Sequence, residues 1–251
     1  MRTVPLLLAD FYKVCHQAQY DKRITRLASY FTPRMSRLNQ KEVVMFGLQG
    51  FIKEFLIEYF NTNFFELDED EVINEYERIL KYAIGEGTYN SDCVRSLHKL
   101  GYLPIEICAI EEGTLVPMGA PIIQLTNTHP NFAWLSGALE TLFSCELWHP
   151  MVSATVGYMY RQIVNKYYGL TVEDNVPRNS ALGDFSLRGQ ESLHSGIKSS
   201  AGWCMSFINS ATIPVIPYLE EYYNCDSSKE IVTKGAVSTE HSVMCSSATI
   251  D

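Results

Sequence analysis

The sequence lacks the short signatures that mark the common nucleotide-binding and membrane classes. It has no Gly-rich phosphate loop of the form GxxxxGK[ST] or GxGxxG, which argues against a P-loop ATPase or a dinucleotide-binding oxidoreductase. No stretch approaches the roughly 18 apolar residues that a membrane span needs. The apolar run at residues 4–9 is too short for a signal peptide. We therefore expect a soluble protein.

Positive charge is also scarce. The 251 residues contain 20 Lys and Arg against 29 Asp and Glu, which gives a formal net charge of −9. Nucleic acids and anionic membranes bind to basic surfaces, so we expect neither as a partner. An anionic ligand must then be held by a few local cations and by backbone N–H groups.

The cysteines form no metal-binding or disulfide pattern. There are seven, and no two have the spacing Cys-x-x-Cys; they are Cys15, Cys93, Cys108, Cys145, Cys204, Cys225 and Cys245. An odd number of scattered thiols is typical of a reduced, cytoplasmic protein. We expect neither a zinc site nor a disulfide framework.

Hydrophobic periodicity divides the chain into two parts. With 46% hydrophobic and 20% charged residues, the chain has ordinary globular composition. The first part, residues 1–149, is predicted to be an α+β domain. Its expected helices are 41–60, 69–83 and 131–145, and its expected strands are 104–110 and 114–126. A further helix is expected over 151–168, after a soft boundary near residue 149.

The second part, residues 150–251, alternates strand and helix. The expected strands are 180–187, 204–209 and 236–239, separated by helices at 190–202 and 213–223 and followed by another helix after His241. This alternation predicts the first strands of an incomplete, TIM-like α/β barrel. Three strands do not close a barrel, so we expect the remaining strands to lie outside these residues.

Catalytic groups of such folds collect at the C-terminal ends of the strands. Here we expect Phe185, Arg188 and His241 to share one hollow. His241 is a candidate base, acid or nucleophile. Alternatively, it is a partly exposed histidine in a helix-capping turn. Arg188 is a candidate phosphate or carboxylate clamp, or else a salt-bridge partner of Asp184. Phe185 is a candidate stacking platform, although a phenylalanine at a strand end is more often part of the core.

Near the start, Asp10, Tyr12 and Lys13 fall within four residues, which by themselves predict only the first turn of an amphipathic helix. Arg34 follows in Phe-Thr-Pro-Arg and by default is a surface charge.

Five segments together resemble the nicotinamide phosphoribosyltransferase family. They are LADFYKVCH at 8–16, SYFTPR at 29–34, LPIEI at 103–107, GDFSLRG at 183–189 and EHS at 240–242. Each is weak alone, but their order and spacing match the family across essentially the whole chain. The family joins nicotinamide to the ribose of 5-phosphoribosyl pyrophosphate and releases pyrophosphate.

The resemblance implies roles for named residues. Phe185 and Tyr12 would stack on the two faces of the pyridine ring, with Tyr12 from the second subunit of a homodimer. Arg188 would hold the phosphoribosyl group, and Asp10 would lie near the base and ribose. Lys13 and Arg34 would lie near phosphate groups.

The resemblance also implies two cofactors. Mg²⁺ would accompany the pyrophosphate substrate, and ATP would phosphorylate His241, whose turnover drives an otherwise balanced equilibrium.

The sequence departs from the family at residue 211. The family's nicotinamide enzymes have an aspartate there that accepts a hydrogen bond from the carboxamide, and this chain has Ala211. Loss of a buried acceptor costs about 1–3 kcal/mol of amide binding, so nicotinate is an alternative substrate. In another interpretation, Asn209 or Ser210 replaces the missing group.

The sequence also stops before the family's later barrel strands. We therefore expect no turnover from the isolated chain. A non-catalytic or split subunit that pairs with a second chain is an alternative function.

Overall fold

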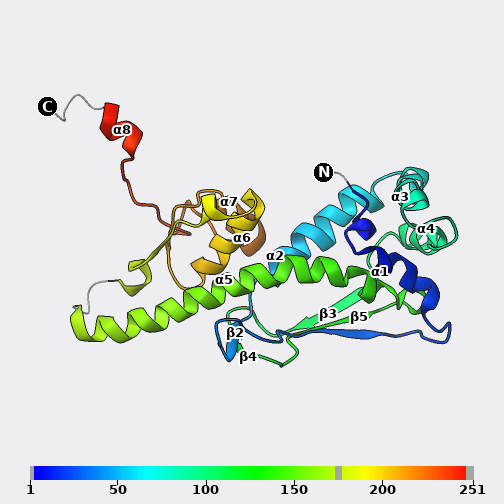
Figure 1. Cartoon of the computed structure of the whole chain (residues 1–251), viewed down its shortest axis with the longest axis horizontal. Coiled ribbons are helices and arrows are strands. Elements are labelled where there is room, and N and C mark those ends of the chain that lie inside the picture. Colours follow the sequence, from blue (N-terminus) through cyan, green and yellow to red (C-terminus); the bar gives the residue numbers. More distant parts are fainter. Residues whose placement is uncertain (1–2, 173–176, 247–251) are drawn as a thin grey trace. The chain divides into compact units, whose positions relative to one another are not determined.

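The computed structural model describes residues 3–172 and 177–246. They form two compact units, Met1–Thr155 and Val156–Asp251, which we describe separately. The long helix α5 (Leu135–Thr171) begins in the first unit and ends in the second (Figure 1). The chain has mixed helix and strand content, as the sequence predicts.

The sheet of the first unit is antiparallel. β5 (Ile123–Asn127) lies in the centre, with β1 (Ala28–Phe31) on one side and β3 (Ile105–Ala109) on the other. A second ribbon pairs β2 (Glu42–Val44) with β4 (Leu115–Pro117). The predicted strand 104–110 is confirmed. The predicted strand 114–126 is two strands, β4 and β5, separated by the Met-Gly-Ala-Pro turn.

Helices cover the core of this unit. They are α1 (Phe11–His16), α2 (Leu48–Phe51), α3 (Glu69–Ala83) and α4 (Ser91–Leu100), and α2 continues as π-helical turns over Ile52–Tyr59 and Asn61–Phe65. The side chain of Asp68 caps α3 by accepting from the backbone N–H groups of Asp70 (2.9 Å) and Glu71 (3.2 Å). The largest buried side chains come from α2 and its continuation: Phe51, Phe60 and Phe64, each fully buried.

The second unit contains a small parallel sheet. β6 (Gly183–Asp184) pairs with β7 (Asn209–Ser210), and α6 (Leu193–Cys204) connects the two strands. α7 (Val215–Tyr223) and α8 (His241–Ser246) follow. The core of this unit includes Phe207 and Val215, both with no exposed surface.

Four predicted elements need correction. Residues 42–44 of the predicted helix 41–60 form β2, because they pair with β4, more than 70 residues later in the chain. The predicted helices 131–145 and 151–168 are one helix that contains Pro150. The predicted strand 236–239 is wrong: the parallel pairing there is a single bridge between Asn209 and Lys234, and Val237 is fully exposed and buries nothing that could hold a strand.

The strands of the second unit are also shorter than predicted. Cys204 ends α6 rather than starting a strand, and the pairing of β6 with β7 covers two residues in each strand. The incomplete barrel therefore stays a prediction. The boundary predicted between residues 149 and 150 lies inside α5, and the two domains also stay a prediction.

None of the helices in the described part of the chain is both long and apolar enough to cross a membrane.

Candidate functional site

The tips of β6 and β7 are held together by one buried carboxylate. Asp184 is 8% exposed, and its Oδ1 accepts a hydrogen bond of 2.9 Å from the backbone N–H of Ser186. Its Oδ2 accepts from the hydroxyl groups of Ser200, on α6, and Ser210, on β7. The backbone carbonyl of Asp184 accepts from the N–H of Ala211 at 2.8 Å. A single residue thus contacts both strands and the helix between them.

Phe185 and Arg188 lie in the turn that follows β6. The Phe185 side chain is 74% exposed, so it does not belong to the core. Its ring lies back over Gly183, where a Cβ would come within 3.3 Å of the ring carbon Cε2. Arg188 is exposed and belongs to the short 3-10 helix Leu187–Gly189. The ring of Phe185 and the guanidinium of Arg188 are thus both exposed to solvent in the same turn.

Arg188 does not pair with Asp184. Among the described residues Arg188 has no ion pair, and the carboxylate of Asp184 is already hydrogen-bonded to two hydroxyls and one N–H. The guanidinium of Arg188 is therefore available to an anionic ligand.

The end of β7 presents no carboxylate. Ala211 is exposed at this tip. Ser210 cannot replace the missing acid, because its hydroxyl is buried between Asp184 and Ser200. The side-chain amide of Asn209 donates to the carbonyl of Ser180 at 2.7 Å. The side chains of Asn209 and Ser210, which precede Ala211, are therefore both already hydrogen-bonded within the second unit.

His241 lies apart from this turn in the chain and in its contacts. It is the first residue of α8 and is exposed, as are residues 234–240 before it. In the described part of the chain, no hydrogen bond or ion pair joins it to Phe185 or Arg188. The structure brings Phe185, Arg188 and Ala211 to neighbouring strand tips. The third strand that was expected to position His241 is a single bridge, so a hollow shared with His241 stays a prediction.

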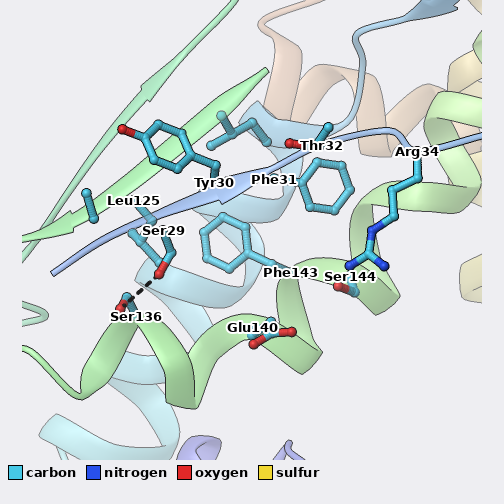
Figure 2. Close-up of a pocket in the computed structure, with 12 residues that line it drawn as sticks. Ser29, Tyr30, Phe31, Thr32, Arg34, Leu125, Ser136, Glu140, Phe143 and Ser144 are labelled. Atoms are coloured by element: carbon cyan, nitrogen blue, oxygen red, sulfur yellow. Dashed lines mark hydrogen bonds between the residues drawn. The ribbon is translucent and has the colours of Figure 1, made fainter. Parts of the chain in front are cut away.

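The first unit contains an open pocket of about 550 Å³ between β1 and α5 (Figure 2). Ser29 and Ser136 are hydrogen-bonded across it at 3.2 Å. Figure 2 shows Arg34 extending from the chain after β1 toward Ser144 on α5. Arg34 is exposed and has no ion pair among the described residues, so this end of the pocket carries an unneutralised positive charge.

The other predicted residues of the first unit lie around α1. Thr141 donates to Asp10 Oδ2 at 2.7 Å. Tyr12 is 55% exposed. Lys13, in contrast, is buried and forms an ion pair with Glu140 on α5. Its charge is therefore neutralised, and it would reach a phosphate only by leaving this carboxylate.

Buried thiols do not add a nucleophile. Burial raises the pKa of Cys93 to about 12 and that of Cys204 to about 11, so both remain protonated at neutral pH. All seven cysteines are free thiols in the structure.

The residues described also give no metal site. Within 3–172 and 177–246, no group of three or more His, Cys, Asp or Glu side chains is arranged to hold a metal ion. Mg²⁺ that accompanies the pyrophosphate substrate stays a prediction, since this ion is commonly held by one or two carboxylates together with substrate phosphates.

Sequence reasoning missed the part that Asp184 plays. It considered this residue only as a strand-end acid and a partner for Arg188. The partners Ser200 and Ser210 are 16 and 26 residues away in the chain, and no local pattern links them to Asp184. The one available signal was an acid inside a predicted strand, since a carboxylate that becomes buried there needs hydrogen-bond donors.

Comparison with known proteins identifies one family. The family model "Nicotinamide phosphoribosyltransferase, N-terminal domain" matches residues 5–107. The chain is 37% identical to a nicotinamide phosphoribosyltransferase of Acinetobacter baylyi, over 97% of this chain and 49% of that protein. It is 29% identical to a nicotinamide phosphoribosyltransferase of Xanthomonas campestris pv. campestris, over 87% of this chain and 45% of that protein.

A solved structure shares the fold. The crystal structure of human nicotinic acid phosphoribosyltransferase matches with a TM-score of 0.65 and 17% identity, over 95% of this chain and 40% of that chain. The chain spans about half the length of the curated relatives it matches. The resemblance seen in its five motifs is confirmed by these matches, and the chain belongs to the nicotinamide phosphoribosyltransferase family.

Proposed function

We propose that this chain is part of an enzyme of NAD salvage that transfers a phosphoribosyl group from 5-phosphoribosyl pyrophosphate to nicotinamide. The ring nitrogen of the base forms a bond to the anomeric carbon, while the bond from that carbon to pyrophosphate breaks. The products are nicotinamide mononucleotide and pyrophosphate. The observation that carries the proposal is that the ring of Phe185 and the guanidinium of Arg188 are both exposed, in the one turn that follows β6 of the parallel pair.

The chemistry needs positioning more than it needs a nucleophile. A flat base must present its ring nitrogen to the sugar, and stacking on Phe185 restricts the base to one plane. Positive charge develops on the ribose in an oxocarbenium-like transition state, and negative charge develops on the departing pyrophosphate. Arg188 is our candidate for the phosphoribosyl group. Arg34, which has no ion pair in the described structure, is our candidate for binding a phosphate group at the pocket of the first unit.

The second face of the base is proposed to be covered by Tyr12 of a second copy, in a homodimer. The exposed side chain of Tyr12 supports this role. We also propose that ATP transfers its γ-phosphoryl group to an imidazole nitrogen of His241, with ADP leaving. The exposure of His241 supports access by ATP. A mass increase of one phosphate on incubation with ATP, absent from His241→Ala, is the expected result.

Nicotinate is the second candidate substrate, and Ala211 is the observation that favours it. A carboxylate at residue 211 would repel an anionic base and accept from an amide, and the alanine does neither.

The experiment uses base binding, because we expect no turnover from the isolated chain. Nicotinamide and nicotinate are titrated separately into the ¹⁵N-labelled chain. We expect amide shifts confined to residues 183–189 and 209–212, and none in Phe185→Ala. Shifts elsewhere, or equal shifts in Phe185→Ala, would overturn the assignment of this turn. Product formed by the chain alone would contradict the expectation of no turnover, and co-purification with a second polypeptide would favour the split-subunit alternative.

A further inference from the structure

We infer that Asp184 is a positioning residue, whose buried carboxylate sets the places of Phe185 and Ala211. The inference is drawn from hydrogen bonds within the second unit. Its consequence for base binding rests on the proposed function.

The geometry gives Asp184 a connection to each side of the candidate site. On the Phe185 side, Asp184 Oδ1 accepts from the N–H of Ser186 at 2.9 Å. This hydrogen bond spans Phe185 and restricts its backbone. On the Ala211 side, its backbone carbonyl accepts from the N–H of Ala211 at 2.8 Å. Phe185 and Ala211 are therefore each attached to the same residue.

Two hydroxyl groups hold that residue in place. The Ser200 and Ser210 hydroxyls both donate to Asp184 Oδ2, and their oxygens lie 2.6 Å apart. The Ser210 oxygen in turn accepts from the N–H of Thr212 at 3.0 Å, which fixes the chain just beyond Ala211. The carboxylate thus orders the residues on both sides of Ala211.

Burial makes these bonds hard to replace. Ser200 has no exposed surface, Ser210 is 5% exposed and Asp184 is 8% exposed. Water cannot substitute for a lost carboxylate at such a site without opening the structure, and the hydroxyls would be left unpaired.

The backbone pairing at these strand tips is short. On one side of β7, the Ser210 N–H donates to the Lys234 carbonyl at 3.1 Å and the Lys234 N–H donates to the Ile208 carbonyl at 2.6 Å. β6 and β7 pair over Gly183–Asn209 and Asp184–Ser210 only. Two residue pairs are too few to fix a strand tip, so the side-chain network must supply the order that longer barrel strands would provide.

Four variants test this inference. Asp184→Ala removes the carboxylate, and Asp184→Asn keeps an oxygen for Ser186 and a group that can hydrogen-bond to the two serines. Ser210→Ala removes one donor to the carboxylate and serves as the second test if Asp184→Ala does not fold. Ser192→Ala is the matched control. It removes the cap of α6, where Ser192 Oγ accepts from the Ser195 N–H at 3.1 Å, and leaves the network intact.

The first readout is amide hydrogen exchange of Ser186, Ala211 and Thr212 without any ligand. In Asp184→Ala we expect amide exchange at least about tenfold faster at Ser186 and Ala211. Ser186 loses its carboxylate acceptor, and Ala211 keeps a carbonyl acceptor whose position is no longer fixed by the two serines. Ser210→Ala should accelerate Thr212 most. Asp184→Asn should stay within about threefold of the wild type, because it retains hydrogen-bonding groups at the same places. Ser192→Ala should lower the melting temperature and leave these three amides relatively unchanged. If Ser186 and Ala211 exchange in Asp184→Ala at the same rates as in the wild type, the inference is overturned.

The second readout is base affinity, and it separates this inference from the proposed function. We expect Asp184→Ala to bind the base at least about tenfold more weakly, with Asp184→Asn restoring most of the affinity. If the wild type binds no base, the proposed function fails and the exchange data still decide the role of Asp184. If the wild type binds and Asp184→Ala retains full affinity, the positioning role fails and the proposed function stands.

Discussion

The hydroxyl of Thr141, on α5, donates a hydrogen bond of 2.7 Å to Asp10 Oδ2, just before α1 begins. This contact attaches to α5 the segment that carries Tyr12 and Lys13. Thr141→Val removes the donor with little change of shape, and we expect it to lower the free energy of unfolding by about 0.5–1.5 kcal/mol. Thr141→Ser retains the hydroxyl and should cost less. Thermal unfolding of the two variants checks this, and an equal loss in both would assign the effect to packing instead.

Gly47 is the glycine whose substitution should cost most in the first unit. Its φ is +98°, and an added Cβ would lie 2.7 Å from Pro150 Cγ. Gly47→Ala therefore combines backbone strain with a clash against a buried proline, and we expect a loss of about 1–3 kcal/mol in the free energy of unfolding.

Gly169 provides the control for this substitution. It lies inside α5, and no atom lies within 4 Å of an added Cβ. Gly169→Ala should stabilise the protein by up to about 1 kcal/mol, because alanine favours the helix. Denaturation of both variants measures the pair. A loss in Gly169→Ala as large as that in Gly47→Ala would show that the clash with Pro150 is not the cause.

Local patterns predicted the elements whose stability is local. The helix over 69–83 was predicted with its bounds, because its acidic opening and its apolar spacing both lie within one short segment. β2 was missed because Val43 and Val44 satisfy a helical period as well as a strand, and only pairing with residues 115–117 decides between them. A boundary was predicted near residue 149, but α5 continues through Pro150. The helix accommodates it where Gly47 leaves room for the ring.

Stability should fall at high pH because of Cys93 and Cys204. Burial raises the folded-state pKa of these thiols to about 12 and about 11, whereas unfolded thiols ionise near 9.0. Their contribution to stability is therefore complete below about pH 9 and is lost as the pH rises toward 11 and 12. Each thiol should reduce the free energy of unfolding by up to about 1.4 kcal/mol per pH unit in that range.

Cys93→Ala isolates the contribution of one thiol. The slope of unfolding free energy between pH 9 and the pKa of Cys93 should be shallower in this variant than in the wild type. Cys204→Ala gives the comparison for the thiol whose pKa is raised to about 11, and it should also make the slope shallower. Identical slopes in all three proteins would contradict a raised pKa for Cys93.

Base selectivity should depend on residue 211. Ala211→Asp adds an acceptor for a carboxamide and a charge that repels a carboxylate, at an exposed strand tip. We expect the preference for nicotinamide over nicotinate to rise by about 1–3 kcal/mol, which is roughly fivefold to a hundredfold or more in the ratio of dissociation constants. Ala211→Asn, which adds an uncharged group of similar size, should shift the ratio less. An unchanged ratio in Ala211→Asp would remove residue 211 from the specificity of the site.

The candidate site was predicted in part. The turn with Phe185 and Arg188 follows from its position after a predicted strand, and both side chains are exposed as a ligand-binding role requires. The burial of Lys13 against Glu140 was not predictable, because the two are 127 residues apart in the chain. The position of His241 was predicted from a strand that the chain does not form, since Ala236–Thr239 has one large apolar residue and that residue is exposed. The role of each site residue remains a prediction.

The most direct test of the account is a crystal structure of the chain with nicotinamide. We predict the pyridine ring parallel to the Phe185 ring, at the distance of offset-stacked aromatic groups, with its carboxamide directed toward Ala211. A nicotinamide ring bound away from the turn 183–189, with the Phe185 ring still free in solvent, would contradict the central claim that the tips of β6 and β7 bind the base.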